Sequence, residues 1–152
     1  MDNIKLIDGI KVSSLNQFKD ERGAVFHVLK ESDKHFHRFG EAYISKVNSN
    51  VVKGWKFHKK MHQNFCVPFG EIKLVVFDGR KESPTYDKIN EFILSPDDSN
   101  YKLISIPPKL WYGFKSISEP YSLLLNITDM VHDSNESFTK DLNDNSIKYK
   151  WK

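Results

Sequence analysis

The segment VVKGWKFHKKMHQNF, from Val51 to Phe65, concentrates residues that can do chemistry. It contains four lysines, two histidines, one tryptophan and two phenylalanines. Lysine and histidine can bind a phosphate, histidine can ligate a metal, and either can remove a proton as a general base. The same composition also fits the basic, solvent-exposed face of a strand without a chemical role. Which of these holds depends on the elements that position the segment.

If this segment is a β-strand, alternate side chains point to opposite faces. Residues 54, 56 and 58 then share one face, and residues 55 and 57 share the other. Lys56 and His58 are therefore expected to point the same way. His62 is harder to place, because the residues before it read as a loop.

Short apolar, β-branched and aromatic runs recur along the chain at intervals of about ten residues, separated by Gly, Pro, Asn and Asp. The expected strands are Ile4–Ile7, Ile10–Ser13, Ala24–Leu29, Ala42–Val47, Val51–Phe57, Asn64–Pro68, Glu71–Asp78, Lys88–Leu94, Lys102–Ile106, Trp111–Ser116 and Tyr121–Thr128. This spacing is typical of an all-β sandwich or barrel. We expect one β-barrel or jelly-roll domain over residues 1–152, with a ligand site in its mouth.

Three other features complete the expected architecture. Pro96–Ser99 is the best helical candidate and can form one turn at most. The polar segment Asp133–Ser146 is expected to be a loop, and the Ile147–Trp151 segment that follows is expected to pack back onto the barrel.

Composition and charge exclude several classes of function. Lys and Arg number 23 against 20 Asp and Glu, and the resulting net charge of +3 is too small to argue for a nucleic-acid partner. Cys66 is the only cysteine, so an internal disulfide is impossible, and we expect it to be a buried apolar residue. The N-terminal residues MDNIKLIDGIKV do not resemble a signal peptide, and no apolar run is long enough for a membrane span. We expect a cytoplasmic protein without a membrane partner.

Seven motifs, in order along the chain, resemble those of the dTDP-4-dehydrorhamnose 3,5-epimerases, which are cupin-fold enzymes. The resemblance runs from about Asp20 to Trp151 and lies in DERG, VVKGW, PFGEI, DGRKESPT, IPPKLWYGF, NITD and LNDNSIKYKW. It implies an all-β, cupin-type double-stranded β-helix and a homodimer. It also implies proton removal and return beside the C4 ketone of a nucleotide-linked sugar, with no metal or organic cofactor.

The resemblance also implies where the reacting groups lie, and there the sequence departs from the family. Lys56 stands at the position of the family's base, a histidine, and His58 replaces a glutamine two residues later. Gln63 replaces the lysine that stabilises the enolate, and Leu125 replaces the tyrosine that acts as the acid. Tyr112, before the Gly-Phe of IPPKLWYGF, replaces a histidine of the corresponding family motif. Two residues keep the family pattern: the carboxylate near the C-terminus, Asp144, and the arginine that reaches the nucleotide, Arg22.

The replacements are compatible with the same chemistry. A lysine desolvated in a barrel mouth and close to other cations becomes a usable base at neutral pH, which makes Lys56 the first candidate and His58 the second. The candidate catalytic residues are Lys56, His58, Tyr112 and Asp144. The candidate substrate-binding residues are Arg22, Lys53, Gln63 and Lys73. Arg80 is expected to have a structural role, in which it stabilises its own loop by pairing with acidic side chains.

Metal-binding cupins carry a His-x-His pair followed by a glutamate and a later histidine. Lys56 breaks that pair here, and His58 with His62 provides too few ligands for a zinc or iron site, so we expect no metal. Two other functions remain open: a sugar-nucleotide-binding protein without catalysis, and a ketoisomerase that moves the keto group between C3 and C4.

Overall fold

The computed structural model describes residues 4–34 and 36–152. Strands are its only regular elements, and no helix in the described part is long and apolar enough to cross a membrane. The strands are β1 (Lys11–Ser14), β2 (Gln17–Asp20), β3 (Gly23–Phe26), β4 (Glu41–Asn48), β5 (Val52–His58), β6 (Gln63–Phe69), β7 (Ile72–Phe77), β8 (Ile89–Leu94), β9 (Lys102–Ile106), β10 (Trp111–Ser116), β11 (Tyr121–Thr128) and β12 (Ser137–Thr139).

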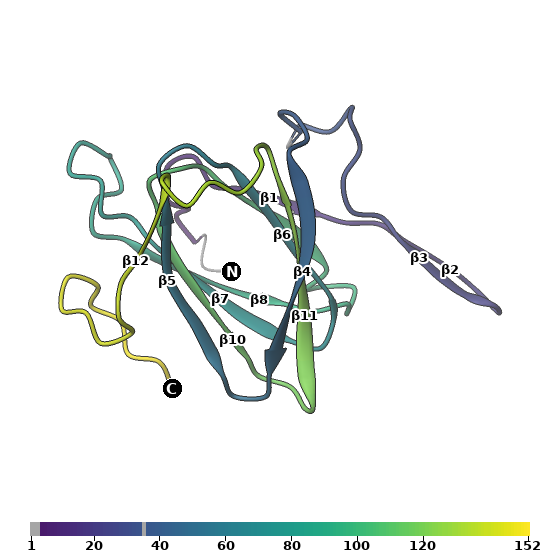
Figure 1. Ribbon diagram of the computed structural model, residues 1–152. Coiled ribbons are helices and arrows are strands. Elements are labelled where there is room, and N and C mark those ends of the chain that lie inside the picture. The colour runs from purple at the N-terminus through teal and green to yellow at the C-terminus, as the bar shows by residue number, and fades with distance from the viewer. Residues whose placement is uncertain (1–3, 35) are drawn as a thin grey trace.

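Two five-stranded antiparallel sheets face each other (Figure 1). The first sheet has the order β1-β9-β6-β11-β4 and the second has the order β12-β5-β10-β7-β8. Chain neighbours such as β4 and β5, or β6 and β7, alternate between the sheets, which is the pattern of a jelly roll. The prediction of an all-β, cupin-type fold is confirmed.

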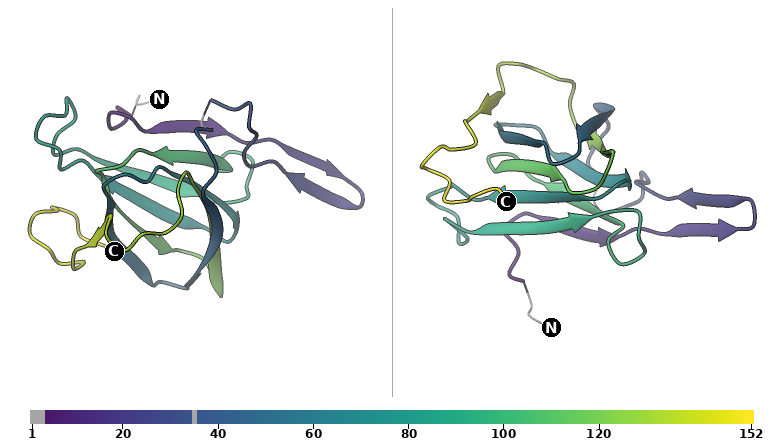
Figure 2. Two further views of the ribbon diagram at one scale, coloured as in Figure 1. Left: turned by 45° about the horizontal axis from the view of Figure 1, so that its top comes forward. Right: turned by 90° about the horizontal axis from the view of Figure 1, so that it is seen from below.

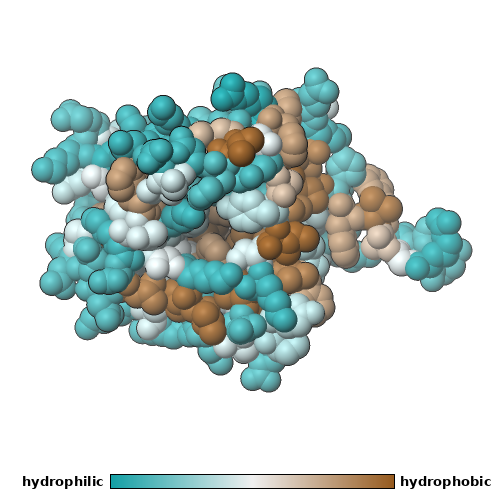
Figure 3. All heavy atoms as spheres, in the orientation of Figure 1, coloured by the Kyte–Doolittle hydropathy of each residue, from teal (hydrophilic) through white to brown (hydrophobic). Residues whose placement is uncertain are grey.

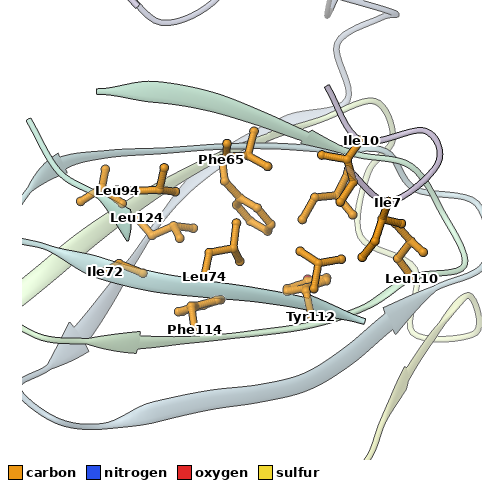
Figure 4. Close-up of a cluster of buried hydrophobic side chains, with 14 of the residues drawn as sticks. Ile7, Ile10, Phe65, Ile72, Leu74, Leu94, Leu110, Tyr112, Phe114 and Leu124 are labelled. Carbon is orange, nitrogen blue, oxygen red and sulfur yellow. The ribbon is translucent and has the colours of Figure 1, made fainter. Parts of the chain in front are cut away.

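The core lies between the two sheets, where alternate residues of each strand point inward (Figure 4). Phe65 and Leu124 come from the first sheet, and Leu74, Tyr112 and Phe114 come from the second. The bulky rings fill much of this space, which explains how a chain of modest apolar content builds a core. Tyr112 also belongs to this core, but unlike its neighbours there it carries a hydroxyl group. This hydroxyl provides a reactive polar group at one end of the core.

A second apolar cluster covers the outer face of the second sheet. Trp55, Val75 and Phe77 point outward there, and the C-terminal segment lies over them with Ile147 and Trp151. The prediction that this segment packs on the barrel is confirmed. The packing depends on Gly113 of β10, because a Cβ at that position would stand 2.9 Å from the Trp151 ring.

Three sequence predictions about elements were wrong. Ile4–Ile7 is not a strand: Ile7 is buried, but its amide is bonded to the Asn90 side chain at 2.8 Å instead of to a neighbouring strand. Gln17–Asp20, where no strand was predicted, forms β2, whereas Pro96–Ser99 keeps to the predicted limit of a single turn. The polar segment Asp133–Ser146 contains a short strand, β12, which pairs with β5.

The hairpin of β2 and β3 forms a small sheet of its own and projects from the barrel (Figures 1 and 2). Its turn uses Gly23 at a φ of +145°, a conformation that favours glycine. Phe18, Val25 and Phe26 are exposed along the arm by 60%, 63% and 40%. An isolated two-stranded hairpin is marginally stable in water, so this arm needs something to pack against.

Buried Asp78 organises the loop between β7 and β8. Arg80 donates from Nε to Asp78 Oδ1 at 2.8 Å, and the hydroxyls of Ser83 and Thr85 donate to Oδ2 at 2.7 Å each. Burial alone raises the pKa of the Asp78 carboxyl, but these hydrogen bonds outweigh burial and hold the pKa well below its ordinary value. The expected structural role of Arg80 is confirmed.

This network makes a testable contribution to stability. The unfolded chain takes up the Asp78 proton near the ordinary pKa of about 4, and the folded chain does so only at lower pH. The contribution is therefore present above about pH 4 and lost as the pH falls. We expect Asp78→Asn to lower the free energy of unfolding by about 3–5 kcal/mol at pH 7, because it leaves Arg80 without its partner.

Urea unfolding of both proteins between pH 7 and pH 2.5 measures this difference. Glu82→Gln, in an exposed residue of the same loop, is the matched control and is expected to stay near the native value. Equal stability of Asp78→Asn and the native chain at pH 7 would contradict the account.

Candidate functional site

A groove opens into the barrel between β4 of the first sheet and β5 of the second, the two strands at the front of Figure 1. The space-filling view in the same orientation shows the surface hollowed there (Figure 3). Its volume is about 200 Å³, and its lining residues are Tyr43, Ser45, Lys53, Gly54, Lys56, Phe65, Tyr112, Phe114 and Leu124. This is less than the roughly 300–1,000 Å³ of a pocket for a drug-sized ligand, and it suits a single sugar ring.

Strand β5 positions Lys56 in the lining of this groove. Trp55 and Phe57 point to the outer face, where Trp55 packs on Trp151 and Phe57 packs on Phe138. Lys56 and His58 therefore turn inward, and the predicted shared face is confirmed. Lys56 is the cross-strand partner of Tyr112 on β10, so the amine and the phenol lie side by side on one wall.

Behind this wall, three buried groups form a hydrogen-bonded chain. His58 Nδ1 is bonded to Glu136 Oε1, and His58 Nε2 lies 3.2 Å from the Tyr112 hydroxyl. Glu136 also accepts hydrogen bonds from the backbone amides of Lys60 and Met61 at 3.1 and 3.3 Å. Because His58 and Glu136 are each only 3–4% exposed, solvent has little access to their charges.

The protonation states of this chain follow from its surroundings. Burial lowers the pKa of His58, and this outweighs the opposing effect of Glu136, so the imidazole is neutral at neutral pH. Burial alone raises the pKa of Glu136, but the bonds from His58 and the Lys60 amide outweigh it, so the carboxylate is ionised. We therefore assign the His58 proton to Nδ1, facing Glu136, which leaves Nε2 to accept from Tyr112. Burial raises the pKa of Tyr112, so its hydroxyl keeps the proton.

The opposite wall carries a second polar network. Asn126 Nδ2 donates to Gln63 Oε1, and it also donates to the Tyr43 hydroxyl at 2.9 Å. Gln63 and Asn126 are 1% and 0% exposed, so this amide pair is fixed inside the barrel. The Gln63 side chain also interacts with the Tyr112 hydroxyl, which connects the two walls at the base of the groove.

The other predicted site residues lie farther out. Lys53 sits at the rim, where its Nζ donates to Ser45 Oγ at 2.8 Å and to the Lys46 carbonyl at 2.9 Å and so spans from β5 to β4. Asp144 is not brought to the groove: it lies in the loop before the C-terminal segment and accepts bonds from Ser146. Its pKa is lowered by Ser146, not by Lys56 or His58.

Two further predicted residues are also outside the groove. Lys73 lies on the outer face of the second sheet, with its Nζ 5.6 Å from the centre of the Tyr149 ring and 5.7 Å from that of Trp151. Arg22 lies at the tip of the projecting hairpin, 2.7 Å from Asp20, with its side chain 84% exposed. Within one chain, Arg22 therefore contacts no groove residue.

The remaining histidine and cysteine of the sequence analysis lie elsewhere. His62 Nδ1 is 3.0 Å from Asp129 Oδ2 in a separate pocket at the end of β6, beside Arg38. Cys66 is buried on the outer side of the first sheet, where burial raises its pKa to about 12. Over residues 4–34 and 36–152, no group of three His, Cys, Asp or Glu side chains is placed to hold a metal ion.

Sequence reasoning missed three residues that complete the site: Tyr43, Asn126 and Glu136. Glu136 lies 78 positions from His58 and reaches it because β12 pairs with β5, setting Ser137 opposite His58. No local pattern marks so short a strand in a polar segment. Tyr43 and Asn126 are direct cross-strand partners on β4 and β11, and the alternation in these two predicted strands could have suggested that pair.

Comparisons with known proteins identify the family and support the fold. The family model described as dTDP-4-dehydrorhamnose 3,5-epimerase matches residues 5–152. The crystal structure of a dTDP sugar isomerase from Desulfovibrio desulfuricans G20 superposes with a TM-score of 0.92 at 39% identity, covering 95% of this chain and 92% of that one.

Two further relatives were identified by sequence. The spore coat polysaccharide biosynthesis protein SpsL of Bacillus subtilis is 26% identical over 96% of this chain and 97% of its own length. The probable low-salt glycan biosynthesis epimerase Agl13 of Haloferax volcanii is 30% identical over 84% of this chain and 81% of its own length. With a family match over almost all of its residues, the chain belongs to the dTDP-4-dehydrorhamnose 3,5-epimerase family of sugar-nucleotide epimerases and isomerases.

Proposed function

We propose that the protein epimerises a dTDP-4-keto-6-deoxyhexose at C3, at C5 or at both, in the synthesis of deoxysugars for a surface polysaccharide. The observation that carries this proposal is the groove between β4 and β5, where two amines and two phenols line a space for one sugar ring. The family match supports the substrate class, and the names of the relatives from Bacillus subtilis and Haloferax volcanii support a role in polysaccharide or glycan synthesis.

Lys56 is the base of the proposed reaction. It lines the groove, whereas His58 does not and has both ring nitrogens engaged by Glu136 and Tyr112. In its unprotonated form, the Lys56 amine would take the proton from the carbon beside the ketone, and the electrons of that C–H bond would move into an enolate. General-base catalysis of this kind contributes about 10²–10⁴-fold to a rate.

Tyr112 stabilises the negative charge on the enolate oxygen. Its hydroxyl is held only loosely by His58, at 3.2 Å, so it can turn to donate a hydrogen bond to the ketone oxygen as negative charge develops there. His58 and Glu136 act through Tyr112 and are positioning residues. In this arrangement Glu136, and not the predicted Asp144, is the buried carboxylate that supports the catalytic groups. Asp144 takes no direct part in the reaction.

Substrate binding divides between the groove and its rim. The groove takes the sugar ring, and the dTDP group remains outside the barrel because the space is too small for it. Gln63 does not line the groove, so it serves the substrate through Asn126, to which it is hydrogen-bonded. Lys53, at the rim, is placed to meet the diphosphate once it exchanges its contacts with Ser45 and the Lys46 carbonyl. Lys73 faces away from this path and is left out of the binding site.

We further propose that two copies form a homodimer through the projecting hairpin. The arm contacts its own chain where Lys19 pairs with Asp98 at 2.9 Å and where the Phe26 ring packs on Tyr101, but Phe18, Val25 and Phe26 remain exposed. A second copy would cover these side chains, and it would bring Arg22 close to the nucleotide at the partner's groove. The large exposure of the Arg22 side chain in one chain is consistent with that role.

The reaction is tested with dTDP-4-keto-6-deoxyglucose in heavy water, with deuterium at C3 and C5 followed by NMR. We expect the native protein to exchange at least one of these positions and Lys56→Met to reduce that exchange by about 10²–10⁴-fold. His58→Gln is expected to lower exchange less, because His58 acts through Tyr112. Lys150→Met, in an exposed lysine of the C-terminal segment, is the matched control and should exchange like the native chain.

Other outcomes separate the alternatives. Binding of the sugar nucleotide without exchange by the native chain would indicate a non-catalytic binding protein. A product whose keto group has moved from C4 to C3 would indicate a ketoisomerase. Full exchange by Lys56→Met would contradict the assignment of the base.

The dimer is tested by light scattering coupled to size exclusion. We expect the native chain to elute as a dimer and Val25→Asp to shift it to a monomer, because a buried unpaired charge is costly at an interface. Val131→Asp, at a residue of similar exposure on the loop after β11, is the control and should remain a dimer. A native monomer, or a dimer that survives Val25→Asp, would refute the hairpin interface.

A further inference from the structure

Inversion of a carbon requires proton removal on one face of the sugar and proton return on the other. In the proposed reaction, Lys56 acts from β5 of the second sheet, so the returning proton must come from the facing wall. That wall is β4 of the first sheet, whose residues Tyr43 and Ser45 line the same groove. Ser45 accepts a hydrogen bond from Lys53 at 2.8 Å, and its aliphatic hydroxyl is a much weaker acid than a phenol, so Tyr43 is the acidic group on this side.

The contacts of Tyr43 leave its proton available. Its oxygen accepts a hydrogen bond from Asn126 Nδ2 at 2.9 Å. With the Asn126 amide assigned so that Nδ2 faces Tyr43, no acceptor among the described residues takes the Tyr43 hydroxyl hydrogen, which can then point into the groove. Tyr43 is 42% exposed along the groove, while Asn126 behind it is fully buried, so the phenol faces the groove and is backed by a buried amide.

The alternative donors face the wrong way. Tyr112 is the cross-strand partner of Lys56 and belongs to the same wall, so it cannot reach the opposite face of a sugar held between the sheets. Leu125, at the position where the family carries its acid tyrosine, packs against the apolar cluster outside the first sheet with Cys66 and Tyr101. An acid in this chain must therefore come from a different strand position.

We propose that Tyr43 is the catalytic acid, donating its hydroxyl proton to the enolate carbon on the face opposite Lys56. This inference rests on the proposed function. The C–H bond breaks toward the Lys56 amine, which becomes an ammonium, and the electrons pass into the enolate. They return to form a new C–H bond as the Tyr43 O–H bond breaks and the ketone re-forms. The resulting phenolate and ammonium exchange one proton through solvent to restore the starting state.

The surroundings of Tyr43 suit both halves of that step. Burial raises the pKa of its hydroxyl, so the phenol carries its proton at neutral pH. Once the proton has left, the Asn126 amide donates to the phenolate from a fixed position and lowers the cost of the charge. Gln63 holds Asn126 in that orientation by accepting its second hydrogen bond.

Separate readouts of proton removal and inversion test the proposal. With dTDP-4-keto-6-deoxyglucose in heavy water, we expect Tyr43→Phe to keep deuterium exchange within about threefold of the native rate and to lower formation of the inverted sugar by about 10²–10⁴-fold. The enolate still forms in this variant, but it regains its proton from the Lys56 side. Tyr112→Phe is expected to lower exchange and inversion together, by about 10²–10³-fold.

Tyr86→Phe, on the exposed loop before β8, is the control for loss of a phenol and should match the native chain. Thermal midpoints and affinity for dTDP establish that each variant is folded. Inversion by Tyr43→Phe at the native rate, or parallel loss of exchange and inversion in a folded variant, would overturn the proposal. Absence of exchange by the native protein would instead refute the proposed epimerase function, and the inference would fall with it.

Discussion

The hydrogen bond between Glu136 and His58 is the contact on which the site depends. It exists because the three-residue strand β12 pairs with β5 and places a carboxylate inside the protein. An ionised carboxylate is costly to bury, and this one is compensated by His58 and by the amides of Lys60 and Met61. The bond fixes the imidazole and its tautomer, and through the imidazole it orients Tyr112. Removal of either partner would leave an unsatisfied buried group next to the groove.

The two sheets of the jelly roll divide the chemistry between them. The second sheet presents Lys56 and Tyr112, backed by the ionised Glu136, and is suited to take a proton and stabilise an enolate. The first sheet presents Tyr43 on a buried amide network and is suited to give a proton. Because the walls come from separate sheets, a flat sugar ring between them exposes one face to each. The fold thus supplies the opposition of base and acid that inversion requires.

Much of the fold could be predicted from the sequence because strands alternate and turns carry Gly, Pro and Asn. The same alternation placed Lys56 and His58 together. Glu136 could not be found this way, since its strand is short, polar and distant in sequence from β5. Lys73 was expected near the site as a cation close to Lys56, although the alternation of charged and apolar residues in Glu71–Leu74 already indicates that Lys73 faces away from the core. The structure turns Leu74 and Val76 inward and Lys73 outward.

A crystal structure with dTDP-glucose, which lacks the reactive ketone, tests the central claim most directly. We expect the glucose ring between Lys56 and Tyr43, the diphosphate at Lys53, and the hairpin of a second copy beside the thymidine. A sugar bound elsewhere, such as in the pocket beside His62 and Asp129, would contradict the assignment of the groove as the active site.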